Sequence, residues 1–181
     1  MKYTFAKTEE ELNQILELQA SNHYSQISKE TKLEEGFVTV RHTLKLLKTI
    51  SGNFQHSIAK ANDKVVGYAL MMLKEKGNEI QELKIMFELL DSLSFKGVKL
   101  ADCKYCVMGQ VCIDKDYRGH GVFENLYQNL KSQISKHFSL LITEISTSNL
   151  RSLRAHTRLG FVSIHQYTDE IDEWVVVAWQ L

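Results

Sequence analysis

The chain has 181 residues, and its 22 lysine and arginine residues equal its 22 aspartate and glutamate residues in number, so its formal net charge is zero. This balance excludes a general electrostatic attraction to nucleic acid or to an anionic membrane, and we expect a partner of neither kind. The length and the 44% share of hydrophobic residues predict one domain that spans residues 1–181.

The cysteines and the N-terminal residues indicate a compartment. Three cysteines, an odd number, argue against a secreted disulfide framework. Cys103 and Cys106 form a C-x-x-C pair, but no second pair completes a zinc site, and the apolar surroundings favour buried thiols. Because signal-peptide and membrane-spanning patterns are absent, the sequence predicts a reduced, cytoplasmic protein without a metal.

The first part of the chain predicts a short strand and two helices. Tyr3–Phe5 is the strand candidate. Thr8 and Glu11 have the spacing of a capping box, in which the hydroxyl and the carboxylate each accept a backbone N–H, and apolar residues follow at helical spacing. A second helix is expected near Thr43–Ile50, whereas residues 23–36 have no clear pattern.

The middle of the chain predicts a hairpin, a helix and a core strand. Ser57–Ala61 and Val65–Met72 flank Asn62-Asp63-Lys64, a sequence suited to a tight reversal. Ile80–Leu90 carries apolar residues on one side of a predicted helix. Tyr105–Ile113 is strongly apolar, as expected of a buried strand.

The last part predicts alternating helices and strands. A long amphipathic helix begins at Val122, because apolar residues repeat there every four positions. A second core strand, a second helix ended by Gly160 and a final strand pair follow, at Leu140–Ile145, Asn149–Leu159, Val162–Gln166 and Trp174–Trp179. This order of elements predicts a mixed sheet covered by helices, an α/β (α+β) domain.

The segment Arg118-Gly119-His120-Gly121-Val122-Phe123 joins the apolar strand to the long helix. The start of a helix leaves N–H groups unpaired and favours negative charge, and glycines let a backbone approach an anion closely. Arg118 adds a permanent positive charge. These features predict a pyrophosphate site, although a tight turn that needs glycine explains the loop alone equally well.

A second motif makes the interpretation specific. The family pattern N-x-x-[AS]-…-G-F fits Asn149, Ser152, Gly160 and Phe161, and the loop pattern [QR]-x-x-G-x-[GA] fits the segment that starts at Arg118. On these two motifs in this order, the chain resembles the GCN5-related N-acetyltransferase (GNAT) superfamily across residues 65–161. The resemblance implies the GNAT-like acyl-CoA N-acyltransferase fold, with a central mixed sheet of about six to seven strands flanked by helices and a splayed parallel strand pair.

The resemblance also implies a cosubstrate, acetyl-CoA (coenzyme A), bound where Tyr105–Ile113 and Leu140–Ile145 splay apart. The strand backbone would pair with the pantetheine arm, the glycine loop would bind the pyrophosphate, and Asn149 would hold the arm from the other side. Phe123 stands where the family usually has glycine or alanine. The implied binding residues are Val111, Cys112, Ile113, Arg118, Gly119, His120, Gly121, Val122, Phe123, Asn149 and Ser152.

The implied reaction needs an acid and a base. His156 lies two helical turns after Asn149, on the same face and about 10 Å along the axis, so it would reach the thioester and protonate or hydrogen-bond the departing thiolate. It stands where the family has tyrosine. Glu144, the one charged residue in an apolar strand, is the candidate base for the amine, with a solvated strand end as the equal alternative.

Other polar residues fit ordinary structural roles better. Arg151, Arg154 and Arg158 are expected to form a solvated helix face rather than a phosphate site. Gln110, in the apolar strand, is expected to satisfy backbone groups.

Two classes of function stay open on these residues. The first is an enzyme that moves an acetyl group from acetyl-CoA to a primary amine by direct attack on the thioester. The second is a non-catalytic acyl-CoA-binding domain, a sensor or scaffold, that uses the same loop. Transfer of a longer acyl group, or transfer to oxygen, is a third reading. The acceptor, a small-molecule or peptide amine, and the oligomeric state, a homodimer included, are not readable from the sequence.

Overall fold

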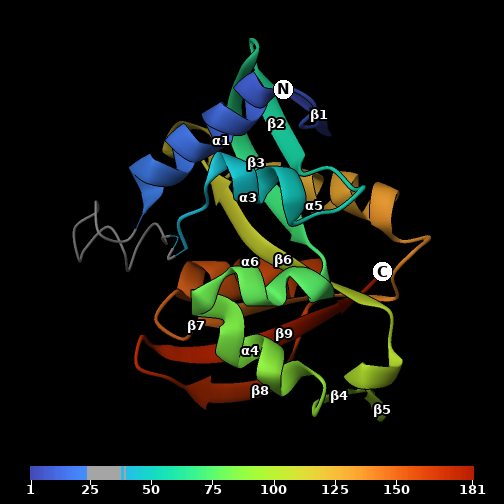
Figure 1. Ribbon diagram of the computed structural model, residues 1–181. Helices are drawn as coiled ribbons and strands as arrows, with labels where there is room; N and C mark the ends of the chain where they lie inside the picture. The colour runs from blue at the N-terminus through green and yellow to red at the C-terminus, as the bar shows by residue number, and fades with distance from the viewer. Residues whose placement is uncertain (24–37, 39) are drawn as a thin grey trace.

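The computed structural model describes residues 1–23, 38 and 40–181 (Figure 1). Seven strands form the main sheet: β1 (Lys2–Phe5), β2 (Ser57–Ala61), β3 (Lys64–Met72), β6 (Tyr105–Ile113), β7 (Leu140–Ser146), β8 (Val162–Thr168) and β9 (Glu173–Gln180). Their order is β1-β2-β3-β6-β7-β9-β8. The β6–β7 pair is parallel and its neighbours are antiparallel, so the predicted mixed sheet is confirmed.

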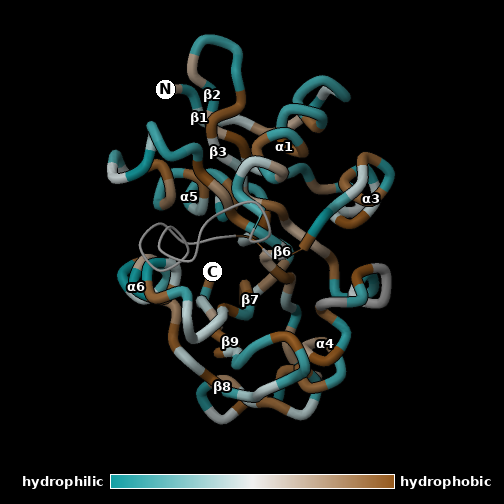
Figure 2. Tube along the Cα trace, turned by 90° about the vertical axis from the view of Figure 1, so that its left-hand side faces the viewer, coloured by the Kyte–Doolittle hydropathy of each residue, from teal (hydrophilic) through white to brown (hydrophobic). Residues whose placement is uncertain are grey.

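Helices cover both faces of this sheet. Figure 2 views it from the side, with α5 (Val122–Ile134) and α6 (Leu150–Leu159) on one face and α1 (Glu9–Asn22), α3 (Leu44–Thr49) and α4 (Lys84–Leu90) on the other. The core is accordingly divided into two layers of buried side chains, one on each face of the sheet. None of the described helices is both long and apolar enough to cross a membrane.

Threonine side chains cap the first two helices, and the cap at Thr8 was predicted. The Glu11 amide donates to the Thr8 hydroxyl at 3.1 Å, and the Glu11 carboxylate accepts from the Thr8 amide at 3.2 Å, which completes the capping box of α1. The hydroxyl of Thr43 accepts from the Leu46 amide at 3.2 Å and starts α3. These bonds satisfy N–H groups that the first helical turn leaves unpaired.

The predicted hairpin is confirmed, with a tighter turn than expected. Ala61 pairs with Lys64, so the reversal uses only Asn62 and Asp63, whose φ angles are 48° and 65°. Asparagine and aspartate tolerate this left-handed conformation better than other non-glycine residues. Lys64 therefore belongs to β3, not to the turn.

The helix predicted at Ile80–Leu90 begins later. Ile80 is extended, at φ −125° and ψ 108°, and a 3₁₀ turn at Gln81–Leu83 (η2) precedes α4. Because residues three apart also share a face in a 3₁₀ turn, Ile80 and Leu83 still point into the core, and their spacing resembles that of an α-helix. The short strands β4 (Ser94–Phe95) and β5 (Val98–Lys99) were not predicted, and neither were the 3₁₀ helices η1 (Lys74–Glu79) and η3 (Leu100–Asp102).

Strands β6 and β7 separate partway along their length. They pair only at Tyr105↔Leu140, Cys106↔Leu141 and Val107↔Ile142, although β6 continues to Ile113 and β7 to Ser146. Just beyond the last pair, the Thr143 hydroxyl donates to the Met108 carbonyl at 2.9 Å. The second half of β6 therefore pairs with β3 on one side and borders a gap on the other.

Gly160 ends α6 as predicted, in the left-handed conformation at φ 107°. The amide of Phe161 donates to the His156 carbonyl at 3.0 Å, and the Phe161 ring packs against the Trp179 ring with centroids 5.6 Å apart. A Cβ atom at Gly160 would lie 3.3 Å from the Trp179 indole nitrogen. This corner therefore needs glycine both for its backbone angle and for space.

We predict that Gly160→Ala lowers the free energy of unfolding by about 2 kcal/mol, because alanine is strained at this φ and crowds Trp179. Gly97→Ala is the matched control, since Gly97 has φ 82° but open space around a Cβ atom. It should cost about 1 kcal/mol, for the backbone alone. Urea unfolding followed by circular dichroism measures both, and equal losses would contradict the crowding at Trp179.

Candidate functional site

The loop between β6 and α5 is shaped by two glycines and an arginine. Gly119 and Gly121 have φ angles of 80° and 73°. A Cβ atom at Gly119 would meet nothing within 4 Å, so glycine is needed there for its backbone angle and not for space. Arg118 donates through Nε to the Ile113 carbonyl at 2.9 Å and through its guanidinium to the Asn22 side chain at 2.6 Å. The arginine thus ties the loop both to β6 and to the end of α1.

Helix α5 starts without a side-chain cap. Its N-cap is Gly121, and the Asn125 amide makes the first helical bond, to the Gly121 carbonyl at 3.1 Å. The amides of the preceding turn, Val122 to Glu124, thus lie at an uncapped helix start, and all three residues line a cavity. This geometry can bind an anion through backbone N–H groups.

That cavity has a volume of about 570 Å³ and lies between the loop, the second half of β6 and α6. It brings together all but one of the residues that the sequence analysis assigns to the cofactor, namely Val111, Cys112, Ile113, Arg118, Gly119, Gly121, Val122, Phe123, Asn149 and Ser152. His120 is exposed and is not among its lining residues.

Two arginines of α6 also line the cavity. Arg151 and Arg158 contribute to its wall, whereas Arg154 does not. A solvated helix face was expected for all three; Arg158 is exposed and Arg151 half-buried, and both also border the cavity on the side of α6 that faces the glycine loop. Together with Arg118, these residues give the cavity three permanent positive charges against the one carboxylate of Glu124, and the balance favours a negatively charged ligand.

A second, smaller cavity of about 80 Å³ adjoins the first. The two share four lining residues, Val38, Val111, Asn149 and Ser152, so they are neighbours along the gap between β6 and β7. Both predicted catalytic side chains, Glu144 and His156, line the smaller cavity. A group that enters along the gap from the glycine loop would reach these two residues.

His156 is 2% exposed and makes hydrogen bonds through both ring nitrogens. Nδ1 lies 2.8 Å from the Ser152 carbonyl oxygen, and Nε2 lies 2.6 Å from the Tyr127 hydroxyl. A carbonyl only accepts, so Nδ1 carries the proton and Nε2 accepts from the phenol. Burial lowers the pKa of His156 to about 4, because a charged imidazole would lose its hydration, so the ring is neutral at physiological pH.

His156 belongs to a group of packed aromatic rings, the aromatic cluster, formed with Phe123, Tyr127, Phe161 and Trp179. The Phe123 ring lies 4.9 Å from the imidazole and 4.8 Å from the Tyr127 ring. The side chain of Phe123 is thus part of the packing between α5 and α6, and its backbone lies at the helix start. The aromatic cluster fixes the orientation of the imidazole.

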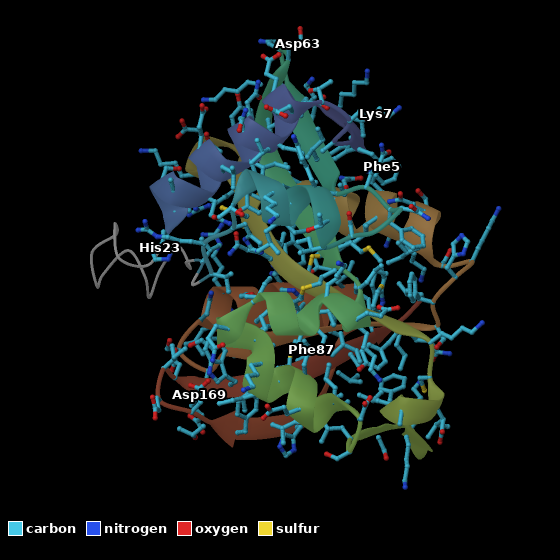
Figure 3. The ribbon with its side chains drawn as sticks, in the orientation of Figure 1. Phe5, Lys7, His23, Asp63, Phe87 and Asp169 are labelled. Carbon is cyan, nitrogen blue, oxygen red and sulfur yellow. The ribbon has the colours of Figure 1, made fainter. Side chains whose placement is uncertain are left out.

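Glu144 is partly buried on β7 and accepts a hydrogen bond from the Tyr167 hydroxyl of β8, across the intervening strand β9. Burial raises the pKa of Glu144 to about 7; the Tyr167 bond acts to lower it, and the charge of Asp169 to raise it. Figure 3 labels Asp169 in the turn between β8 and β9. Glu144 therefore exchanges its proton near neutral pH.

Gln110 has the structural role expected of it. Its amide donates to the Val40 carbonyl at 2.9 Å, and its carbonyl oxygen accepts from Tyr68 at 2.6 Å and from Gln19 at 2.7 Å. It lines the smaller cavity as part of this buried network. The network joins α1 to β3 and β6 and fixes one wall of the gap.

The cysteines and histidines form no metal site in the described part of the chain, where no group of three candidate ligands comes together. Cys103, Cys106 and Cys112 are free thiols. Burial raises the pKa of Cys112 to about 12, so this cavity-lining thiol stays protonated.

Sequence reasoning missed Tyr127 and Tyr167, which bond the two predicted catalytic side chains. Tyr127 matched the repeat of the long helix and was read as core, and nothing marked its phenol. Tyr167 lay just past the predicted strand Val162–Gln166, in a run of polar residues. Each tyrosine did carry a signal. Tyr127 places a phenol, which needs a hydrogen-bond partner, on the buried face of a helix, and Tyr167 stands just before an acidic turn.

The model of the acetyltransferase (GNAT) family matches residues 12–161. Comparison with curated protein sequences gives no match. Several solved structures share the fold at low sequence identity.

The ribosomal-protein-S18-alanine N-acetyltransferase from Escherichia coli has a TM-score of 0.63 and 14% identity, and the match covers 99% of this chain and 92% of that one. NAA60 from Arabidopsis thaliana, in complex with acetyl-CoA, has a TM-score of 0.66 and 10% identity, with 99% of each chain covered. Ard1 from Thermoplasma volcanium has a TM-score of 0.67 and 11% identity, with 99% and 97% covered. These likenesses support the fold, and the family model, which covers most of the chain, shows that the chain belongs to the acetyltransferase (GNAT) family of enzymes.

Proposed function

We propose that this enzyme moves an acetyl group from acetyl-CoA to a primary amine by direct attack of the amine on the thioester. The observation that carries the proposal is the pair of adjoining cavities. One lies at an uncapped helix start with three arginines, and the other contains a carboxylate that titrates near neutral pH. The Arabidopsis NAA60 structure holds acetyl-CoA on the same fold, which supports this choice of donor.

The larger cavity has the chemistry that coenzyme A requires. The amides at the start of α5, with Arg118, would bind the pyrophosphate, and Arg151 and Arg158 would meet the remaining phosphate. The second half of β6 borders the gap, so its backbone can pair with the amides of the pantetheine arm. Val111 to Ile113, with Asn149 and Ser152 opposite, would hold this arm. Exposed His120 would contact the outer phosphates only from the rim.

Glu144 is the proposed general base. Acetyl-CoA supplies the thioester; the nitrogen of the acceptor forms a bond to the carbonyl carbon, and the carbon–sulfur bond breaks. The Glu144 carboxylate takes the proton that the nitrogen loses. A base is most effective when its pKa lies near the working pH, and the pKa of about 7 meets this condition.

His156 is proposed to stabilise the departing sulfur. Because the imidazole is neutral above about pH 4, it would act as a hydrogen-bond donor and not as a charged acid. Its only proton, on Nδ1, now bonds the Ser152 carbonyl, and the Ser152 hydroxyl lies 3.3 Å from the same nitrogen. Donation to the thiolate therefore requires the Nδ1 proton to leave the Ser152 carbonyl and to bond the sulfur instead.

We propose a peptide or small-molecule amine as the acceptor and a cytoplasmic location. The amine must reach Glu144 in the smaller cavity, whose wall includes Leu83 and Met86 of the η2–α4 segment. Three free cysteines suit a reducing compartment.

The first prediction is that the protein releases free coenzyme A from acetyl-CoA faster in the presence of at least one primary amine. A suitable panel is glycine amide, a peptide with a free N-terminal alanine, a lysine-containing peptide, spermidine and kanamycin. A thiol-reactive dye measures the release. Isothermal titration calorimetry measures the affinity of the wild-type protein for acetyl-CoA. Arg118→Ala should weaken this affinity about tenfold, because a charged contact to phosphate is lost.

If acetyl-CoA binds tightly and no amine accelerates thiol release, the protein is a non-catalytic acyl-CoA-binding domain. If longer acyl-CoA donors give higher rates than acetyl-CoA, the donor is misassigned.

The second prediction concerns pH. Glu144 must be ionised to accept a proton, so kcat/KM should rise with pH up to about 7 and then level off, before any further change due to the acceptor. Glu144→Gln should lower kcat about 100-fold and remove this rise. The measurement is a pH–rate profile of both proteins. A variant that keeps the wild-type rate and profile would rule out Glu144 as the base.

The third prediction concerns His156. His156→Phe keeps an aromatic ring among its neighbours but removes the donor, so kcat should fall about tenfold while acetyl-CoA affinity stays within about twofold. Steady-state kinetics and isothermal titration measure the two quantities. An unchanged kcat would show that the imidazole serves packing alone.

A further inference from the structure

We propose that Tyr167 is a positioning residue for the catalytic base: its phenol holds one carboxylate oxygen of Glu144, so that the other oxygen faces the acceptor amine. This inference rests on the proposed role of Glu144. Tyr167 lies on β8, two strands away from β7, and its hydroxyl donates to Glu144 Oε2. Among the described residues, only Tyr167 donates to this carboxylate, and Oε1 is left for a substrate.

The register of the sheet explains why the two side chains meet. Glu144 pairs with Val176 of β9, and Val176 pairs with His165 of β8. Side chains of directly paired residues lie on the same face, and Tyr167, two residues after His165, shares that face. The long phenol thus reaches diagonally over β9 to the carboxylate, and the His165 ring stacks beside it at 6.3 Å.

The turn between β8 and β9 is tied to the end of β7, which fixes Tyr167 relative to the gap. The Ser146 hydroxyl donates to the Asp172 carboxylate at 2.6 Å, and the Thr147 amide donates to the Glu173 carbonyl at 2.8 Å. Within the turn, Asp169 accepts from the Ile171 and Asp172 amides at 2.8 and 2.9 Å. These bonds hold the phenol in one place before a substrate arrives.

Among the side chains that the structure describes, the charged and titratable groups around Glu144 come from three elements. Tyr167 lies on β8, Asp169 in the following turn, and His156 on α6 across the smaller cavity. On the neighbouring walls, the described side chains that line the cavity from β6, η2, α4 and β9 include Gln110, Leu83, Met86 and Trp174, which do not titrate.

Tyr167 and Asp169 act on the pKa of Glu144 in opposite directions: the hydrogen bond from the phenol lowers it, and the charge of Asp169 raises it. Burial and the nearby carboxylate raise the pKa of the Tyr167 phenol, so it stays a donor throughout the working range. Burial opposes ionisation of Asp169, but the amide bonds of the turn outweigh it and hold the pKa of Asp169 below its usual value. Asp169 is therefore charged where Glu144 titrates, and its charge favours the protonated form of Glu144.

The test measures the Glu144 carboxyl directly, so it needs no acceptor. Protein labelled with ¹³C at the glutamate carboxyl carbon is titrated by NMR, and Glu144→Gln identifies the Glu144 signal. Tyr167→Phe, which removes one oxygen atom, should raise the Glu144 midpoint by about one pH unit, because the carboxylate loses a hydrogen bond. Asp169→Asn should lower it. Tyr3→Phe, in β1 at the opposite edge of the sheet, is the matched control and should leave it unchanged.

Activity provides the second readout, with the best amine of the panel. Tyr167→Phe should move the acidic limb of the pH–rate profile upward with the NMR midpoint and lower the rate at pH 7 about fivefold, while acetyl-CoA affinity is unchanged. An unchanged midpoint in Tyr167→Phe overturns the proposal, and so does a rate loss that is equal at every pH. If Glu144→Gln keeps the wild-type rate while Tyr167→Phe still moves the midpoint, the hydrogen bond is real but Glu144 is not the base, and the proposed catalytic role of Glu144 fails instead.

Discussion

The parting of β6 and β7 after three residue pairs is the constraint on which the site depends. Parallel strands normally satisfy each other's backbone groups along their whole length, and a gap leaves one edge of each without a partner strand. Thr143 ends the ladder by bonding the Met108 carbonyl, and beyond it the strands carry the residues of the smaller cavity. The uncapped start of α5 and the side chains of α6 then close the larger cavity around the same opening.

Burial beside this gap has opposite chemical effects on two side chains. It makes the histidine harder to charge, which leaves His156 as a neutral ring between Tyr127 and the Ser152 carbonyl. It makes the glutamate harder to ionise, which brings the pKa of Glu144 to about 7. One physical cause, the loss of hydration, thus produces a neutral imidazole and a carboxyl group that titrates near neutral pH on two sides of the same opening.

Local patterns in the sequence predicted what local chemistry determines. The Thr8 capping box, the hairpin turn at Asn62-Asp63 and the Gly160 helix end depend on residues within a few positions of each other, and all three were predicted, the turn with one residue too many. The cavity residues became predictable only through the resemblance to a family. The bonds of Tyr127 and Tyr167 join positions 29 and 23 residues apart, and such pairs depend on strand order and helix placement. The hydrophobic periodicity of the sequence predicts neither these hydrogen bonds nor the side of α6 that faces the glycine loop.

The incomplete pairing of β6 also links the ligand to the stability of the whole protein. A ligand whose amides pair with the open edge binds the folded chain and has no equivalent partner in the unfolded one. Each tenfold excess of such a ligand over its Kd adds about 1.4 kcal/mol to the free energy of unfolding. The resistance of this enzyme to unfolding and proteolysis would therefore vary with the concentration of its own acyl donor in the cell.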